Sequence, residues 1–224
     1  MVVHESDPSS LALVLAGYAT GTLPPALHAL IGAHLELSPA NRAFVQTLEE
    51  SLGRKVVEAR PAAISHRDAR LDAIFSATTA PFVRAKTSSA EPRALRHYLG
   101  KSVDDLAFRT ILPGVQECRL PVTDDASAMF YKIRPGRKMP QHSHEGFEVT
   151  LVLRGGFSDA SGHFVRGDIA VADEHLDHVP VADSDEECLC FAVLDAPLRL
   201  TGPFGRWANA PLRLLEKLER KPRH

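Results

Sequence analysis

The feature that most constrains the fold of this chain is a change in the spacing of its apolar residues. Through the first third, apolar side chains recur at intervals of three and four, as at Leu11, Val14 and Leu15. This spacing gathers them on one face of an α-helix. In the second half, around segments such as 127–133 and 147–153, the spacing approaches two, which is typical of strands. The sequence therefore predicts helices followed by a strand-rich region.

Proline and glycine mark the ends of the expected helices. Helices are predicted to begin at Asp7-Pro8, Pro24-Pro25 and Ser38-Pro39. Proline is favoured at the first helical position, because its missing N–H would have no partner within the helix there. We expect the first helix to end at Gly21 and the third near Gly53, with a weaker fourth helix over 69–75. Three or four short helices with apolar faces follow from this pattern.

The strand-like segments are short and are separated by turn signals. The turn dipeptides are Pro135-Gly136, Gly155-Gly156 and Gly167-Asp168. Short strands at such spacing predict a sandwich or a barrel. The expected fold class is therefore α+β, with a small all-α N-terminal domain followed by a β-barrel.

Composition shifts suggest where the domains meet. We place a helical domain at 1–78 and a linker at 79–93, where Ser, Thr, Ala and Pro accumulate. The barrel is expected at 94–205, and a C-terminal tail at 206–224.

Charge and cysteine content exclude several classes of function. The net charge is −2 over 224 residues, so no overall basic surface indicates nucleic acid or an anionic membrane as a partner. The three cysteines, an odd number, indicate reduced thiols. The N-terminus has no signal-peptide pattern, and no apolar run approaches the ~20 residues of a membrane span. These features predict a cytoplasmic protein.

The segment 141–153, QHSHEGFEVTLVL, carries the clearest chemical signal. In a regular strand His142, His144 and Glu148 share one face, although a bulge at Gly146 would break that register. Two imidazoles and a carboxylate that converge form a good site for a divalent cation. A fourth ligand is offered by His175 or His178, and we favour His178 because it precedes the extended segment VPV. Spacing alone does not separate zinc from Fe(II) or Mn(II).

From about residue 129 to 200 the chain resembles the C-terminal cupin domain of ChrR-type anti-sigma factors, with H-x-H-x3-E followed by H-x-P. The resemblance implies a metal-binding cupin whose ligands are His142, His144, Glu148 and His178, with zinc as the metal. It also implies that the cupin senses an oxidative stress such as singlet oxygen.

The N-terminal segment, with ATGTLP and AHLELSPANR, is similar to the short helical domain of the same family. That resemblance implies a negative regulator of transcription that sequesters an extracytoplasmic-function sigma factor. Zinc-binding members continue the histidine with two cysteines, but here Ser38 and Asn41 follow His34. With only His4 and His34 left, this degenerate site lacks the four ligands of structural zinc, and we predict no zinc in the domain.

Two questions stay open in the sequence. Cys188 and Cys190 share a strand face and are candidates for a redox role, although buried cysteines often act only as small apolar residues. The rival to the regulatory hypothesis is a metal-dependent cupin enzyme, such as a dioxygenase, with a helical appendage. A third hypothesis is a metal-storage or sugar-recognition module. An enzyme is the less favoured reading, because no general acid, base or substrate anchor stands out beside the expected ligands.

Overall fold

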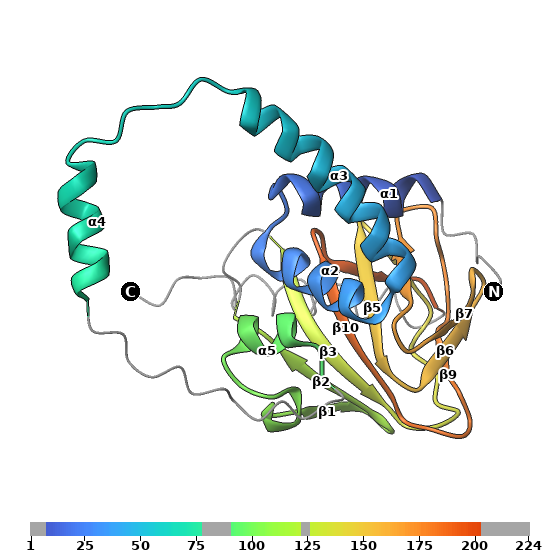
Figure 1. Ribbon diagram of the computed structural model, residues 1–224. Helices are drawn as coiled ribbons and strands as arrows, with labels where there is room; N and C mark the ends of the chain where they lie inside the picture. Colours follow the sequence, from blue (N-terminus) through green and yellow to red (C-terminus); the bar gives the residue numbers. More distant parts are fainter. Residues whose placement is uncertain (1–7, 78–90, 122–125, 203–224) are drawn as a thin grey trace.

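The computed structural model describes residues 8–77, 91–121 and 126–202. Helices come first in the chain, and antiparallel strands make up most of the rest (Figure 1). The predicted α+β fold is confirmed. The expected tail at 206–224 and most of the expected linker at 79–93 lie outside the described residues.

The first three helices begin at the prolines that predicted them. The helices are α1 (Pro8–Thr20), α2 (Pro25–Leu37), α3 (Pro39–Glu58), α4 (Arg67–Ser76) and α5 (Arg93–Leu99), followed by a 3-10 turn, η1 (Val103–Asp105). α1 stops before Gly21, whose φ of +69° lies in the left-handed region. The predicted end of α3 at Gly53 is wrong, because the helix continues to Glu58. A glycine inside an exposed helix costs only about 1 kcal/mol, which the surrounding helix-forming residues tolerate.

The strands form one large sheet and two smaller ones. Along the chain they are β1 (Arg109–Leu112), β2 (Val115–Arg119), β3 (Ser127–Ile133), β4 (His142–His144), β5 (Glu148–Arg154), β6 (Gly156–Asp159), β7 (Gly162–Val165), β8 (Ile169–Ala172), β9 (Val181–Ala182), β10 (Cys188–Leu194) and β11 (Leu198–Leu200). The large sheet has the order β1-β2-β3-β10-β5-β8. The smaller sheets are β7-β6-β9 and β11-β4. Every pairing between these strands is antiparallel.

The large sheet has an apolar core on each face. On the outer face, Phe130, Leu151 and Phe191 pack with residues of α1, α2 and α5. On the inner face, Val152 and Cys190 belong to a second core that includes residues of β6 and β7. Burial on both faces explains why β10 reads as a continuous apolar run rather than an alternation, since all of its residues are buried.

α2 is the helix that holds the helical layer to the sheet. It contacts β5, β10 and α5, and Leu30 and Ile31 are 0% exposed. The Glu36 carboxylate accepts hydrogen bonds from the first N–H groups of α5, at 2.8 Å each. Arg42 in turn donates to the last carbonyls of α2, those of Leu35 and Glu36. The unpaired N–H groups at the start of α5 and the unpaired carbonyls at the end of α2 are therefore hydrogen-bonded by two side chains, those of Glu36 and Arg42.

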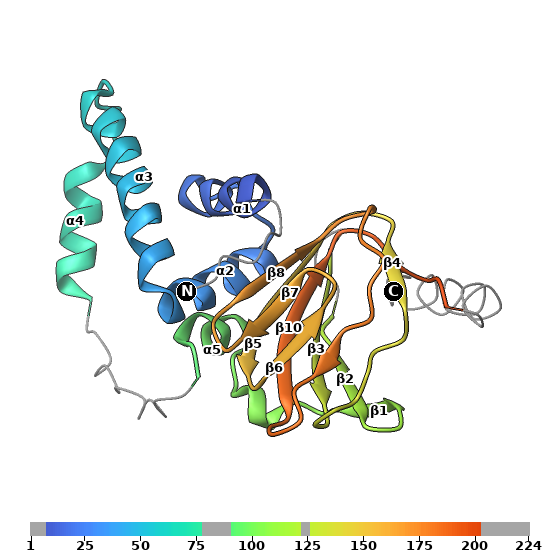
Figure 2. The same cartoon turned by 90° about the vertical axis from the view of Figure 1, so that its right-hand side faces the viewer.

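The far half of α3 and all of α4 extend away from the barrel (Figure 2). No residue of α4 is buried, and several large apolar side chains on this part of the chain are exposed. We call this feature the α3–α4 arm, and its exposed apolar residues are Val56, Val57, Ile64, Ile74 and Phe75.

Within the described residues, no single helix combines the length and apolarity needed to cross a membrane. Ser10–Thr20 and Pro25–Leu37 pass that test only as a pair, and they are bent by 104°.

Candidate metal centre

Three histidines meet inside the barrel because two chain segments are paired there. His142 and His144 lie on β4, which pairs with β11. His178 lies outside the named strands but forms an isolated bridge with His142, through backbone hydrogen bonds of 3.0 and 3.1 Å. The backbone therefore fixes the imidazole of His178 beside those of β4, and all three residues are buried.

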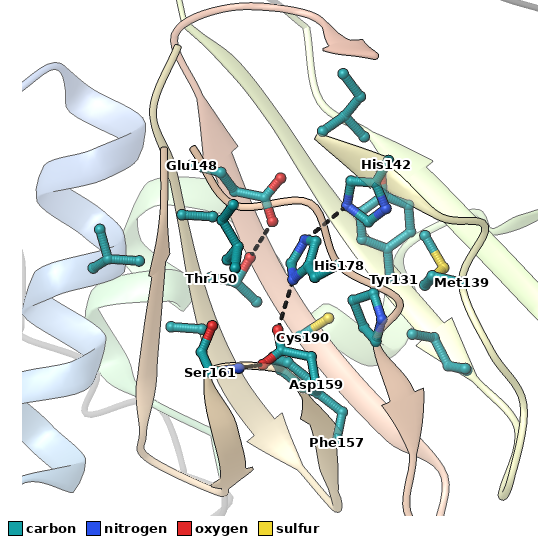
Figure 3. A pocket seen from close by; sticks show the side chains of 17 residues that line it. Tyr131, Met139, His142, Glu148, Thr150, Phe157, Asp159, Ser161, His178 and Cys190 are labelled. Atoms are coloured by element: carbon teal, nitrogen blue, oxygen red, sulfur yellow. Dashed lines mark hydrogen bonds and ion pairs between the residues drawn. The ribbon is translucent and has the colours of Figure 1, made fainter. Parts of the chain in front are cut away.

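The three rings converge through their Nε2 atoms, and Figure 3 shows two of them, those of His142 and His178. The Nε2 of His178 lies 3.1 Å from that of His142 and 3.2 Å from that of His144. Nitrogen ligands at ~2.0–2.1 Å on one tetrahedral ion would lie about 3.3 Å apart. The observed separations are close to that value, so these side chains can hold a metal ion.

The partners of the Nδ1 atoms show which nitrogens are free to bind a cation. His142 donates from Nδ1 to the Pro140 carbonyl at 2.7 Å, and His178 donates from Nδ1 to the Asp159 carboxylate at 2.6 Å. A neutral imidazole carries one N–H, so each of these rings has a lone pair on Nε2. Lone pairs facing each other at 3.1 Å repel, and a shared cation removes that repulsion. Such outer hydrogen bonds to metal-binding histidines also fix the ring orientation.

Burial keeps the rings uncharged. Burial, together with the nearby His178, lowers the pKa of His144 from 6.5 to about 4. Burial likewise lowers the pKa of His142, against the opposing effects of the Pro140 carbonyl and Glu148. The Nδ1 of His144 has no hydrogen-bond partner, and its nearest carboxylate oxygen is Glu148 Oε2 at 3.5 Å. Neutral imidazole is the form that binds metals.

Glu148 lies beside the three histidines but is not part of the convergent group of nitrogens. The strand is interrupted between His144 and Glu148, so the two residues belong to different sheets. At this break Asp195 accepts the N–H of Phe147 at 2.6 Å. The Glu148 carboxylate accepts a hydrogen bond from the Thr150 hydroxyl at 2.8 Å and lines the same cavity as His142 and His178.

Asp159 is a site residue that sequence reasoning missed. Its side chain is 1% exposed. Burial alone would raise the pKa of this carboxyl, but hydrogen bonds from His178 and the Ser161 N–H outweigh it, and the pKa is lowered. Asp159 lies in another hairpin from the histidines, and only the pairing of β6 with β9 brings it near His178. No local motif marks it.

A cavity of about 40 Å³ lies beside the histidines. Its wall is mostly apolar, with Ile133, Met139 and Phe157 among its residues, and it also includes Tyr131. The Tyr131 hydroxyl donates to the sulfur of Met129 at 2.8 Å. The space suits a few waters or a small ligand.

The remaining candidates lie elsewhere or are chemically quiet. His175 is the alternative fourth ligand, but its side chain is 83% exposed. Cys188 and Cys190 are buried free thiols. The hydrogen bond with Cys188, together with burial, raises the pKa of Cys190 well above its ordinary value, so this thiol is not activated as a thiolate.

In the degenerate N-terminal site, His34 uses both ring nitrogens for hydrogen bonds. Its Nδ1 lies 2.7 Å from the Gly167 carbonyl, and its Nε2 lies 2.8 Å from the Asn41 side-chain nitrogen. Ser38 precedes α3 as expected, but its side chain makes no capping hydrogen bond. His4 lies outside the described residues.

Comparison with known proteins agrees with this arrangement. The family model for the ChrR cupin-like domain matches residues 99–197. Over 200 residues the chain is 37% identical to the anti-sigma-E factor ChrR of Cereibacter sphaeroides, covering 88% of this chain and 91% of that protein. The crystal structure of Rhodobacter sphaeroides SigE in complex with the anti-sigma ChrR matches with a TM-score of 0.70 and 34% identity, over 87% of this chain and 99% of the matched chain.

Proposed function

This chain belongs to the ChrR family of anti-sigma factors, and from that premise we propose that it sequesters an extracytoplasmic-function sigma factor and carries a divalent metal in its cupin. The protein would act as a negative regulator of transcription in the cytoplasm, where RNA polymerase works. A relative that shares the fold over most of the chain was crystallised with a sigma factor, SigE.

The observation that carries the sigma-binding role is the exposed apolar surface of the α3–α4 arm. Phe75 is 83% exposed and Val57 is 86% exposed, on helices that extend away from the barrel (Figure 2). Exposed apolar groups gathered on one feature are typical of a protein-binding surface. Amphipathic helices commonly fill the grooves of partner proteins in this way.

The test uses the full chain and a sigma factor of this class encoded in the same genome. We expect a stable complex in size-exclusion chromatography, and the double substitution Ile74→Ser/Phe75→Ser should weaken binding at least tenfold in fluorescence anisotropy. The control, Ile111→Ser/Leu112→Ser, changes exposed apolar residues of β1 and should bind normally. A folded native chain that binds none of the sigma factors would refute the role.

For the cupin, we propose one zinc ion bound by His142, His144 and His178, with Glu148 as the fourth ligand. Three imidazoles and a carboxylate also accept Fe(II) or Mn(II). We propose zinc because it is the metal that the resemblance to this family implies. Bound zinc would link the two strand segments and supply a positive charge in the barrel. Elemental analysis should give about one metal per chain, lost in His142→Ala and retained in His175→Ala.

We propose that the helical domain binds no zinc, so the expected stoichiometry is one rather than two. Supporting this, both ring nitrogens of His34 are engaged in hydrogen bonds, one with the Gly167 carbonyl and one with Asn41, which stands where zinc-binding members have cysteine. A second metal per chain that is lost in His34→Gln would refute this.

The signal that releases the sigma factor is proposed to be oxidative, for example singlet oxygen, and to act through the cupin. Cys190 is a protonated, buried thiol, so attack on a free thiolate is not the favoured first step. Illumination of the complex with a photosensitiser should release the sigma factor from the native chain, and the Cys190→Ala variant should respond alike.

An enzymatic role is less favoured, because the Tyr131 hydroxyl, a potential acid in the cavity, donates to the Met129 sulfur.

A further inference from the structure

The segment 34–42, HLELSPANR, forms the corner between α2 and α3, and it also contacts the barrel. His34 is 3% exposed in the last turn of α2. Its imidazole lies between Asn41 in the first turn of α3 and Gly167 in the turn between β7 and β8. One buried ring therefore joins two helices of the anti-sigma part to a turn of the cupin.

The hydrogen-bonding roles follow from the chemistry of the partners. The Gly167 carbonyl can only accept, so Nδ1 of His34 carries the N–H and Nε2 accepts from the Asn41 amide. Burial lowers the pKa of His34, while the Gly167 carbonyl and the charge of Asp168 act in the opposite direction. The neutral ring that results satisfies both partners at once.

The Gly167 end of this contact is held rigidly by the sheet. The Gly167 N–H donates to the Val152 carbonyl at 2.9 Å, and the Asp168 carboxylate accepts the Val165 N–H at 2.9 Å. The φ of Gly167 is +95°, and a Cβ at this position would lie 3.2 Å from the Cβ of Leu37. The turn therefore packs directly against the end of α2.

The same turn leads directly into the wall of the metal-site cavity. β8 begins at Ile169, and its residues Ala170 and Ala172 line the cavity. Ala172 is paired with Glu148. A single four-residue strand thus separates the His34 contact from the residue next to the metal-binding histidines.

We propose that His34 is the positioning residue through which metal occupancy of the cupin changes the affinity of the helices for the sigma factor. A displacement of β8 moves the Gly167 carbonyl, and His34 carries that displacement to Asn41 and hence to the start of α3. The far end of α3 belongs to the α3–α4 arm. This inference rests on the proposed function. It assigns to His34 a linking role that depends on hydrogen bonds, whereas the corresponding histidine of zinc-binding members is a zinc ligand.

The first test measures sigma binding of the full chain by fluorescence anisotropy, once loaded with Zn²⁺ and once stripped by a chelator. In the native chain we expect the loaded form to bind about fivefold or more tightly than the stripped form, a common size for coupling between sites. In His34→Phe, and in the milder Asn41→Ala, this ratio should fall toward one. The matched control Ser38→Ala, in the same segment but without a capping bond, should keep the native ratio.

The second test needs no sigma factor and reports directly on the contact. In ¹⁵N-resolved NMR of the histidine rings, His34 should show a protonated Nδ1 and an unprotonated Nε2, and its signals should shift on addition of Zn²⁺. Asn41→Ala should abolish or reduce that shift. If His34→Phe does not fold, Asn41→Ala carries both tests, because Asn41 is only partly buried.

The outcomes separate the two proposals. If the native chain binds no sigma factor, the proposed function fails and the NMR shift alone decides whether His34 responds to metal. If the sigma factor binds but the ratio is one in the native chain, or is unchanged in folded His34 and Asn41 variants, the coupling role is overturned.

Discussion

The substitution Gly167→Ala should destabilise the protein by about 2–4 kcal/mol. An alanine held at positive φ costs roughly 1–2 kcal/mol. The added methyl would also lie 3.2 Å from the Leu37 Cβ, and crowding of this kind in a packed contact costs about 1–2 kcal/mol more. For a chain of this size, the sum corresponds to a fall in melting temperature of roughly 5–15 °C.

A matched glycine separates the two contributions. Gly136 has a φ of +68°, but a Cβ there would meet nothing within 4 Å, so Gly136→Ala should lose only the backbone contribution. Urea unfolding of both variants, at constant slope, gives the comparison. The double variant Gly167→Ala/Leu37→Gly, which removes the Leu37 Cβ, should recover the crowding contribution relative to the sum of its single substitutions. Equal losses for Gly136→Ala and Gly167→Ala would refute a tight contact between the β7–β8 turn and α2.

Three further predictions concern the site and the core. Asp159→Asn removes the carboxylate that accepts from His178 and should weaken zinc binding about 10–100-fold in a chelator competition; unchanged affinity would show that the ring needs no such partner. In the metal-free protein, the pKa of His144 is about 4 when folded and 6.5 when unfolded, so the unfolded state binds more protons between these values. The free energy of unfolding should therefore fall by up to about 3 kcal/mol as pH drops through that window. Urea unfolding at several pH values, with a chelator present, measures this fall, and a free energy of unfolding that does not change with pH would contradict the prediction. Leu30→Ala, at a side chain that is 0% exposed between α2 and the sheet, should cost about 2–5 kcal/mol in the same assay, whereas a loss below 1 kcal/mol would mean that the helical layer packs loosely.

Local signals in the sequence predicted α1 to α4 and the strands β3 and β5, because these signals depend only on neighbouring residues. Proline at the first helical position set the starts of α2 and α3, and Gly21 set the end of α1. The end of α3 could not be read in this way, because Gly53 is tolerated inside an exposed helix. The patterns H-x-H-x3-E and H-x-P also identified the chain segments that carry His142 and His178.

What the sequence could not supply depends on contacts between distant segments. Asp159 acts on His178 only because β6 and β9 are paired, and neither strand contains a motif. The sequence identifies Asn41 only as the replacement of a cysteine, whereas the fold gives it a hydrogen bond to His34. Pairing of this kind is set by the whole fold, and a single sequence does not reveal it.

The two-sided burial of the large sheet has a consequence for how such proteins diverge. A recombination event that joined this barrel to a foreign helical segment would expose the face carrying Phe130, Leu151 and Phe191 to water, unless the new helices matched its shape. Descendants that acquire a new partner are therefore expected to alter the projecting ends of their helices and to keep the buried ones. Partner choice can then drift quickly while the scaffold beneath it changes slowly.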